Sequence, residues 1–254
     1  MNIVIPIAGW GTRFMQQGYA TPKSFLPISI TGDSVSMYKT VIENMKHIFS
    51  NEGNLRFYIV CRKSQLKYFS LDVYADYRSV AICPINSDGL GAVSDILKIK
   101  DYINNPYELV IANCDQIVSV DPDRYNVSLG NKSPQVHQVH VLTHEVIDGP
   151  HGYLKVDDKR RVINVAEKEQ ISNTANAGVI YFKRGDDFVD AAKKLMESEQ
   201  YKVNDEYHVF STLNILLNCG IDIYTYPTDK YLSFGTPEDY EKNRGFREDY
   251  HDYI

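Results

Sequence analysis

The chain has 254 residues, of which 43% are hydrophobic and 24% charged, with a formal net charge of −6 at pH 7. These values suit a globular chain with a sizeable core. The negative charge argues against nucleic acid or an anionic membrane as a partner, and no apolar run approaches the roughly 20 residues of a membrane span. No basic segment precedes the first apolar run, and the four cysteines have no CxxC spacing. We therefore expect a cytoplasmic chain with reduced thiols.

Short apolar runs alternate with segments of helical periodicity in the first half of the chain. Strands are predicted at residues 3–7, 55–61, 79–83 and 108–113, and helices at residues 36–49, 63–71 and 91–103. Strands that alternate with helices imply crossover connections, and hence a mainly parallel sheet flanked by helices.

The second half is richer in β-structure. Strands are predicted at residues 135–143, 152–156, 162–166, 177–182 and 222–226, and helices at residues 186–199, 207–218 and 237–245. A hairpin turn is expected at Asp157-Asp158, and Thr236 should cap the last helix, with Pro237 at its first position. Because no linker separates the halves, we predict one α/β domain over residues 1–254. It has a mixed sheet and two lobes, residues 1–120 and 121–254.

A glycine-containing segment, Ala8-Gly9-Trp10-Gly11-Thr12-Arg13-Phe14, follows the first predicted strand, and Lys23 comes soon after. Glycines let a backbone approach a ligand closely and turn its N–H groups toward phosphate oxygens. Arg13 and Lys23 add cations that suit phosphate. On the Gly-x-Gly spacing alone, a plain strand-to-loop turn with surface cations is the favoured interpretation. The segment is neither a GxxxxGK[ST] P-loop nor a Rossmann fingerprint, because Phe14 stands where the third glycine belongs.

Seven segments follow one another along the chain: AGWGTRF (8–14), PKSFLPI (22–28), DGLGAV (88–93), ANCDQ (112–116), EKE (167–169), NAGVIYF (176–182) and FGTPEDY (234–240). Their joint order resembles the sugar-phosphate nucleotidyltransferase (pyrophosphorylase) family, and it is far more specific than any single segment. The resemblance covers essentially the whole chain. It is closest to a short subgroup associated with capsule and surface-polysaccharide enzymes. It implies a GT-A-like (Rossmann-like) α/β fold and an Mg²⁺-dependent enzyme.

The resemblance also implies roles for single residues in the first half, which would be the nucleotide-binding lobe. Nucleotide-binding residues would be Ala8, Gly9, Gly11, Thr12, Arg13, Gly89, Gly91 and Asp115. Arg13 would contact the leaving pyrophosphate, Lys23 would bridge the α-phosphate and the leaving group, and Asp115 would bind Mg²⁺. With Lys168, these three would form the catalytic set.

The second half would be the acceptor-binding lobe. Its implied residues are Gly152, Glu167, Lys168, Asn176 and Gly178. Glu167 would contact substrate hydroxyls and Lys168 the substrate phosphate. Without the resemblance, an exposed charge pair at a strand end would explain Glu167 and Lys168 equally well.

The implied reaction joins an NTP to a small phosphomonoester and releases pyrophosphate. The nucleophile is a phosphate oxygen with a second pKa near 6, so no catalytic Ser, Cys or His is needed. Cations, amides and a metal ion suffice by positioning and electrostatics. We expect a pyrimidine nucleotide, with CTP first, and a sugar 1-phosphate as acceptor. The alternatives are a non-sugar acceptor such as phosphocholine or glycerol phosphate, a GT-A glycosyltransferase, and a regulatory homologue without activity. A monomer and a homodimer both remain open.

Two other patterns resemble metal sites. Asp121-Pro122-Asp123 has the form of a glycosyltransferase DxD motif, but it lies several residues beyond the strand end, and we predict a turn there. His140 and His144 fall on one face of a predicted strand and His137 on the other, so three convergent zinc ligands are not expected.

Ser233 departs from the family pattern, because many members have a second metal-binding carboxylate at this position. A hydroxyl is a poor substitute for a carboxylate as an Mg²⁺ ligand. Three explanations are open: Asp229 reaches the metal, water bridges Ser233 to it, or Asp115 and the NTP phosphates suffice. We favour the third, because a triphosphate already supplies several anionic oxygens.

Overall fold

A computed structural model describes residues 1–29, 34–69, 79–130, 133 and 135–245. Nine strands of this part of the chain form one sheet, in which the path β10-β9-β11-β6-β1-β4-β5 is extended by β8 and β12. Their bounds are β1 Asn2–Pro6, β4 Arg56–Arg62, β5 Val80–Ile85, β6 Leu109–Ala112, β8 Gln138–Glu145, β9 Gly152–Val156, β10 Val162–Glu167, β11 Thr174–Phe182 and β12 Asp222–Pro227.

The first half of the sheet is parallel. β1 pairs in parallel with β4 on one side and β6 on the other, and β4 pairs in parallel with β5. β11 is antiparallel to both β6 and β8, so the sheet is mixed, as the sequence predicts. The carboxyl ends of β1, β4, β5 and β6 therefore meet at one edge of the sheet, the position at which open α/β sheets bind ligands.

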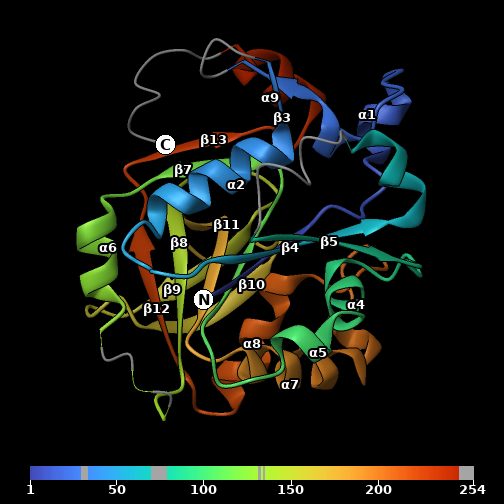
Figure 1. Ribbon diagram of the computed structural model, residues 1–254. Helices are drawn as coiled ribbons and strands as arrows, with labels where there is room; N and C mark the ends of the chain where they lie inside the picture. Colours follow the sequence, from blue (N-terminus) through green and yellow to red (C-terminus); the bar gives the residue numbers. More distant parts are fainter. Residues whose placement is uncertain (30–33, 70–78, 131–132, 134, 246–254) are drawn as a thin grey trace.

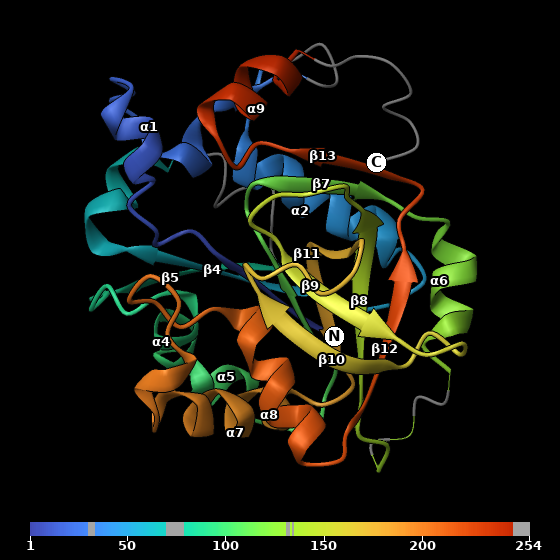
Figure 2. The same cartoon turned by 180° about the vertical axis from the view of Figure 1, so that it is seen from behind.

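Helices cover both faces of the sheet (Figures 1 and 2). One face is covered by α4 Ala92–Leu97, α5 Lys100–Ile103, α7 Gly185–Met196 and α8 Thr212–Asn218, and the other by α2 Met37–Ile48, with α6 Pro122–Ser128 beside it. Among the helices of the described ranges, none has the length and apolar character that a membrane span requires.

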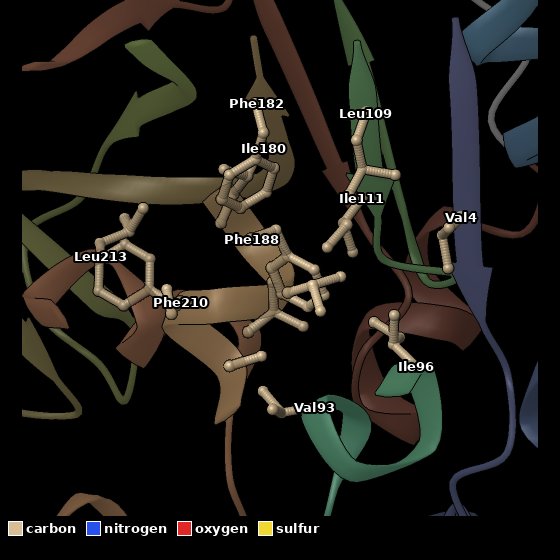
Figure 3. Packing of buried hydrophobic residues seen from close by; sticks show 14 of the residues in the cluster. Val4, Val93, Ile96, Leu109, Ile111, Ile180, Phe182, Phe188, Phe210 and Leu213 are labelled. Carbon is tan, nitrogen blue, oxygen red and sulfur yellow. The ribbon is translucent and has the colours of Figure 1, made fainter. Parts of the chain in front are cut away.

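The strands of the parallel half are buried on both faces. Val4 of β1 lies in one core cluster with Ile96 and Phe188 (Figure 3), whereas its neighbours Ile3 and Ile5 lie in the cluster on the α2 face. Strands buried on both sides have continuous apolar sequences instead of alternating ones. This pattern is why the sequence reveals these strands.

A second strand pair packs against α2. It consists of β7 Gln116–Ser119 and β13 Lys230–Ser233, which are antiparallel. Asn44 of α2 donates to the Val118 carbonyl at 2.8 Å and accepts from the Val118 N–H at 3.1 Å. The sequence analysis did not predict this pair, whose strands have four residues each.

The remaining short elements connect these layers. They are α1 Thr12–Gln16, β2 Pro27–Ile28, β3 Val35–Ser36, α9 Pro237–Asn243 and four 3₁₀ helices, η1 Lys23–Phe25, η2 Lys63–Tyr68, η3 Glu199–Tyr201 and η4 Val209–Ser211. Thr236 caps α9 by accepting from the Asp239 N–H, and Pro237 takes its first position, as predicted. The predicted hairpin turn after β9 is confirmed by the bond from the Asp157 N–H to the Arg161 carbonyl.

Three predicted helices differ from the structure. The helix predicted at residues 63–71 is the 3₁₀ helix η2, and its predicted end at Leu71 lies outside the described residues. The helix predicted at residues 91–103 is divided into α4 and α5, because the N–H groups of Lys98 and Ile99 bond three residues back. The helix predicted from Tyr207 begins only at Thr212, since the Tyr207 backbone bonds to Leu90 and Val93.

The turn predicted at Asp121-Pro122-Asp123 is wrong. Asp121 is the N-cap of α6 and accepts from the Arg124 N–H at 2.9 Å, while Pro122 occupies the first helical position. An acidic cap followed by proline is a helix-start signal of the same kind as Thr236-Pro237. The hydrogen bond that Asp121 accepts therefore caps the first turn of α6.

His140 of β8 is buried among aromatic rings. It is 4% exposed, and its ring centre lies 6.0 Å from Tyr181 and 5.7 Å from Tyr224. Its Nε2 atom has no hydrogen-bond partner among the described residues. Burial, reinforced by the charge of Lys183, lowers the pKa of His140 to about 4. The folded protein therefore holds this imidazole neutral.

This burial predicts a loss of stability in acid. The unfolded chain protonates His140 below about pH 6.5, whereas the folded chain does so only near pH 4, so stability is present above pH 6.5 and lost as the pH falls between these values. His140→Leu should reduce the loss between pH 7 and pH 5 by about 2 kcal/mol. Urea unfolding of both proteins at the two pH values measures this difference, and an unchanged pH dependence in the variant would contradict it.

Candidate active site

A cavity of about 350 Å³ opens at the carboxyl edge of the parallel strands. The segments that follow β1 (6–11), β5 (87–92) and β6 (113–115) line it, together with Lys23, Arg62, Glu206 and His208. The cavity thus combines four of the segments that resemble the nucleotidyltransferase motifs, around residues 8–11, 23–24, 89–92 and 113–115, which are far apart in the sequence.

The glycine segment turns sharply at the end of β1. Gly11 has a φ of +63° and precedes α1 as its N-cap, a conformation that suits glycine. A Cβ on Gly11 would lie 3.4 Å from the Cβ of Lys23, so the segment rests against Lys23. Ala8, Gly9 and Gly11 line the cavity. Thr12 and Arg13, expected in the same set, are exposed residues of α1 and lie outside its lining.

Lys23 and Asp115 form an ion pair inside the cavity. The Nζ atom of Lys23 lies 2.5 Å from Oδ2 of Asp115, and the two side chains are 23% and 17% exposed. Burial by itself would lower the pKa of Lys23, but the Asp115 carboxylate outweighs it and the pKa is raised. Lys23 is therefore an ammonium ion at neutral pH, located between the glycine segment and the end of β6.

The segment after β5 is built from glycines that accept positive φ angles, +81° at Gly89 and +98° at Gly91. A Cβ on Gly91 would lie 2.8 Å from the Tyr207 carbonyl oxygen, so a larger residue would displace backbone. Asp88 fixes the turn by accepting from the Leu90 N–H at 3.0 Å and from the Ser94 hydroxyl at 2.6 Å. The wall of the cavity here is therefore main chain.

The residues expected to bind the acceptor lie beside this cavity and do not line it. Gly178 lies in an irregularity of β11, where the pairing register with β8 shifts, and its N–H donates to Oδ1 of Asn176 at 3.0 Å. A Cβ on Gly178 would collide with the Gln116 side chain, and one on Gly152 with the Phe210 ring. Both glycines are thus also required by packing.

Glu167 and Lys168 follow one another at the end of β10. Burial raises the pKa of Glu167, while the charges of His208 and Lys168 oppose this rise. Lys168 has a φ of +63°, and its N–H donates to the His151 carbonyl at 2.7 Å. Because His208 also lines the cavity, the charge of a cavity residue acts on Glu167.

Ser233 lies close to Asp115 in the structure. The Phe234 N–H donates to the Asp115 carbonyl at 2.8 Å, and a Cβ on Gly235 would lie 3.4 Å from both Asp115 Oδ2 and Ser233 Oγ. Ser233 pairs with Gln116, whereas Asp229 precedes the opposite end of β13. At about 3.3 Å per residue, this register places Asp229 on the order of 13 Å along the strand from Ser233.

The donor set at Asp115 fits a magnesium ion only partly. A carboxylate oxygen is a suitable hard ligand, and Mg²⁺ normally keeps several ligands from water and phosphate. The described residues contain no group of three or more His, Cys, Asp or Glu side chains that could hold a metal. The Ser233 hydroxyl donates to Oδ2 of Asp239 at 3.4 Å. A magnesium ion at Asp115 would therefore need most of its ligands from water and phosphate oxygens.

Several residues of the cavity were not anticipated. They are Arg62, Asp95, Asn113, Glu206 and His208. Asn113 could have been predicted from the sequence, because it belongs to the ANCDQ segment and lies two residues before Asp115. Arg62 is a lone cation at a strand end, and Glu206 and His208 flank a residue that the sequence assigned to the start of a helix.

Neither the protein-family models nor the curated proteins compared with this sequence give a match. Solved structures do, and they define the class of fold as that of the sugar-phosphate nucleotidyltransferases. A nucleoside-diphosphate-sugar pyrophosphorylase from Vibrio cholerae RC9 matches with a TM-score of 0.75 and 19% identity, over 94% of this chain and 98% of that one.

Two further structures have the same fold. A UDP-glucose pyrophosphorylase complexed with UDP-glucose matches with a TM-score of 0.72 and 17% identity, over 96% of each chain. The inositol-1-phosphate CTP transferase from T. maritima matches with a TM-score of 0.69 and 12% identity, over 98% of this chain and 96% of that one. The fold that the resemblance in sequence implied is therefore confirmed.

The surroundings of Asp115 predict how a metal ion binds. With CTP present, Asp115→Asn should abolish binding of the divalent metal ion to the protein, because it removes the carboxylate charge. Ser233→Ala should leave the metal affinity within about twofold, since a hydroxyl contributes little as a ligand. Mn²⁺ titration followed by electron paramagnetic resonance measures both. Equal losses in the two variants would show that Ser233 is a true ligand.

Proposed function

We propose that this protein is a cytoplasmic nucleotidyltransferase that couples an NTP to a small phosphorylated acceptor and releases pyrophosphate. The observation that supports this most directly is the Lys23–Asp115 pair, which lies in a cavity walled by Gly9, Gly11 and the Gly89 segment. A fixed ammonium, a carboxylate and close-approach glycines are the groups that phosphoryl transfer requires.

In the proposed reaction, an oxygen of the acceptor phosphate forms a bond to the α-phosphorus of the NTP. The bond from that phosphorus to the oxygen bridging to the β-phosphate breaks, and pyrophosphate leaves. Lys23 would stabilise the charge on the transferring group, Asp115 would hold the metal, and the backbone after β1 would contact the triphosphate. When bound, Mg²⁺ supplies charge neutralisation at the phosphate oxygens.

We assign the acceptor to the side formed by Gly152, Asn176, Gly178 and the Glu167-Lys168 pair. Glu167 would hold substrate hydroxyls, and Lys168 would hold the acceptor phosphate. His208 connects this side to the cavity through its charge effect on Glu167. This arrangement corresponds to the division into a nucleotide lobe (1–120) and an acceptor lobe (121–254).

For the substrates, we favour a pyrimidine nucleotide and a sugar 1-phosphate, a product class that serves capsule or surface-polysaccharide synthesis. A non-sugar acceptor with CTP is the second candidate, and the likeness to an inositol-1-phosphate CTP transferase supports it. A GT-A glycosyltransferase is disfavoured. Its DxD motif would have to be Asp121-Pro122-Asp123, whose first aspartate caps α6 and whose second accepts from Asn51.

Pyrophosphate release tests this proposal. The purified protein should release pyrophosphate only when an NTP, a phosphorylated acceptor and Mg²⁺ are all present, because the acceptor phosphate is the nucleophile. A coupled pyrophosphate assay that crosses the four NTPs with sugar and non-sugar phosphates measures this. Turnover of a finished sugar nucleotide, with no NTP activity anywhere in the panel, would refute the proposal.

Lys23 provides a second test. Lys23→Ala should lower kcat by on the order of 10²–10³, because the ammonium stabilises charge that develops in the transition state. The matched control is Lys159→Ala, an exposed lysine in the turn after β9, which should keep wild-type kcat. Near-normal kcat in a folded Lys23→Ala protein would refute the assignment.

A further inference from the structure

Arg62 has a distinctive position at the carboxyl end of β4. Its side chain lines the same cavity as Lys23 and Asp115. The Nε atom donates to the carbonyl oxygen of Ala8 at 2.5 Å, and the guanidinium lies 3.9 Å from the centre of the Trp10 ring. Arg62 is thus bound on two sides to the glycine segment after β1.

These two contacts fix the guanidinium plane and leave part of it available. The bond to Ala8 uses Nε, and stacking on Trp10 holds one face by a cation–π interaction. Within the described ranges, no hydrogen bond joins the terminal Nη atoms to a protein group. A planar pair of donors with a fixed orientation matches two phosphate oxygens.

Arg62 is one of two basic side chains of the cavity, and it is the one without an ion-pair partner among the described residues. Lys23 and Arg62 are the two Lys or Arg side chains among the described residues that line it, and Lys23 is already paired with Asp115. Arg62 has no carboxylate within ion-pair distance in the described part of the chain. Arg13 and Lys168, the other expected phosphate contacts, lie outside the cavity lining. The unpaired cation facing the proposed triphosphate is therefore Arg62.

The order of strands in the sheet places Arg62 between the glycine segment after β1 and the Gly89 segment after β5. β4 lies between β1, which leads to the glycine segment, and β5, which leads to Gly89. Because the pairing is parallel, the ends of these three strands lie along one edge, with the end of β6 and Asp115 on the other side of β1. A nucleotide extended along this edge would pass Arg62.

We propose that Arg62 is a phosphate-binding residue of this enzyme: its Nη atoms donate to oxygens of the NTP triphosphate, and the same oxygens leave as pyrophosphate. Trp10 and the Ala8 carbonyl are the groups that hold it in place. This inference rests on the proposed function, but it concerns binding of phosphate and can be tested without turnover. It also gives Trp10, which is 59% exposed, a role as the support of a cation.

Calorimetric titration with inorganic pyrophosphate in the presence of Mg²⁺ tests the proposal. Arg62→Met should raise the Kd for pyrophosphate by about 10- to 100-fold, the effect expected for lost hydrogen bonds to a charged group. Arg62→Lys should give an intermediate Kd, because it keeps the charge and loses the fork. The matched control is Arg56→Met, at the opposite end of the same strand, which should bind as the wild type does.

Trp10 offers a readout in the unaltered protein, because it is the sole tryptophan of the chain. Saturating pyrophosphate should change its fluorescence, and cytidine, which has no phosphate, should change it less. An unchanged pyrophosphate Kd in Arg62→Met, or an effect of this variant on cytidine alone, would overturn the proposal. So would Trp10 emission that does not respond to pyrophosphate.

The outcomes separate this inference from the proposed function. A protein that binds pyrophosphate through Arg62 but shows no transfer activity would refute only the function. A protein that is active as proposed, but whose Arg62→Met variant binds pyrophosphate normally, would refute only the role of Arg62.

Discussion

The parallel pairing of β1 with β4 and β6 determines where everything else in this molecule lies. All five residues of β1 pair with β4, the first three also pair with β6, and the first four are buried. Because neighbouring strands run in the same direction, the chain must leave each of them at the same edge. Segments that are about 100 residues apart in sequence, such as Gly11 and Asp115, are thereby brought to one cavity.

Much of the fold could be predicted because burial on both faces leaves a clear pattern. The strands of the parallel half are continuous apolar runs, and Thr236-Pro237 is a helix start with a known mechanism. The pair β7 and β13 could not be found in this way. Each strand has four residues, and their stability comes from pairing with each other and with Asn44 of α2, contacts that no local pattern encodes.

The site was accessible to sequence reasoning where several residues act together in one segment. Lys23 and Asp115 belong to motifs whose order is specific, and the structure brings them into contact. Arg62 belongs to no such motif. It follows an apolar strand, as surface arginines often do, and its orientation depends on Ala8 and Trp10, more than 50 residues earlier in the chain. Only tertiary structure could reveal it.

The ion pair between Lys23 and Asp115 has a thermodynamic consequence for the order in which the site fills. On the proposed function, a metal ion bound at Asp115 would compete with the Lys23 ammonium, which would lose its partner in a partly buried position. In the proposed enzyme, a phosphate oxygen beside Lys23 would replace that partner. Metal and nucleotide would then bind cooperatively, and by reciprocity each would raise the affinity for the other by the same factor. In the protein alone, Lys23 and Asp115 neutralise each other's charge. A cation or an anion that arrives without the other substrate would therefore bind weakly at this pair.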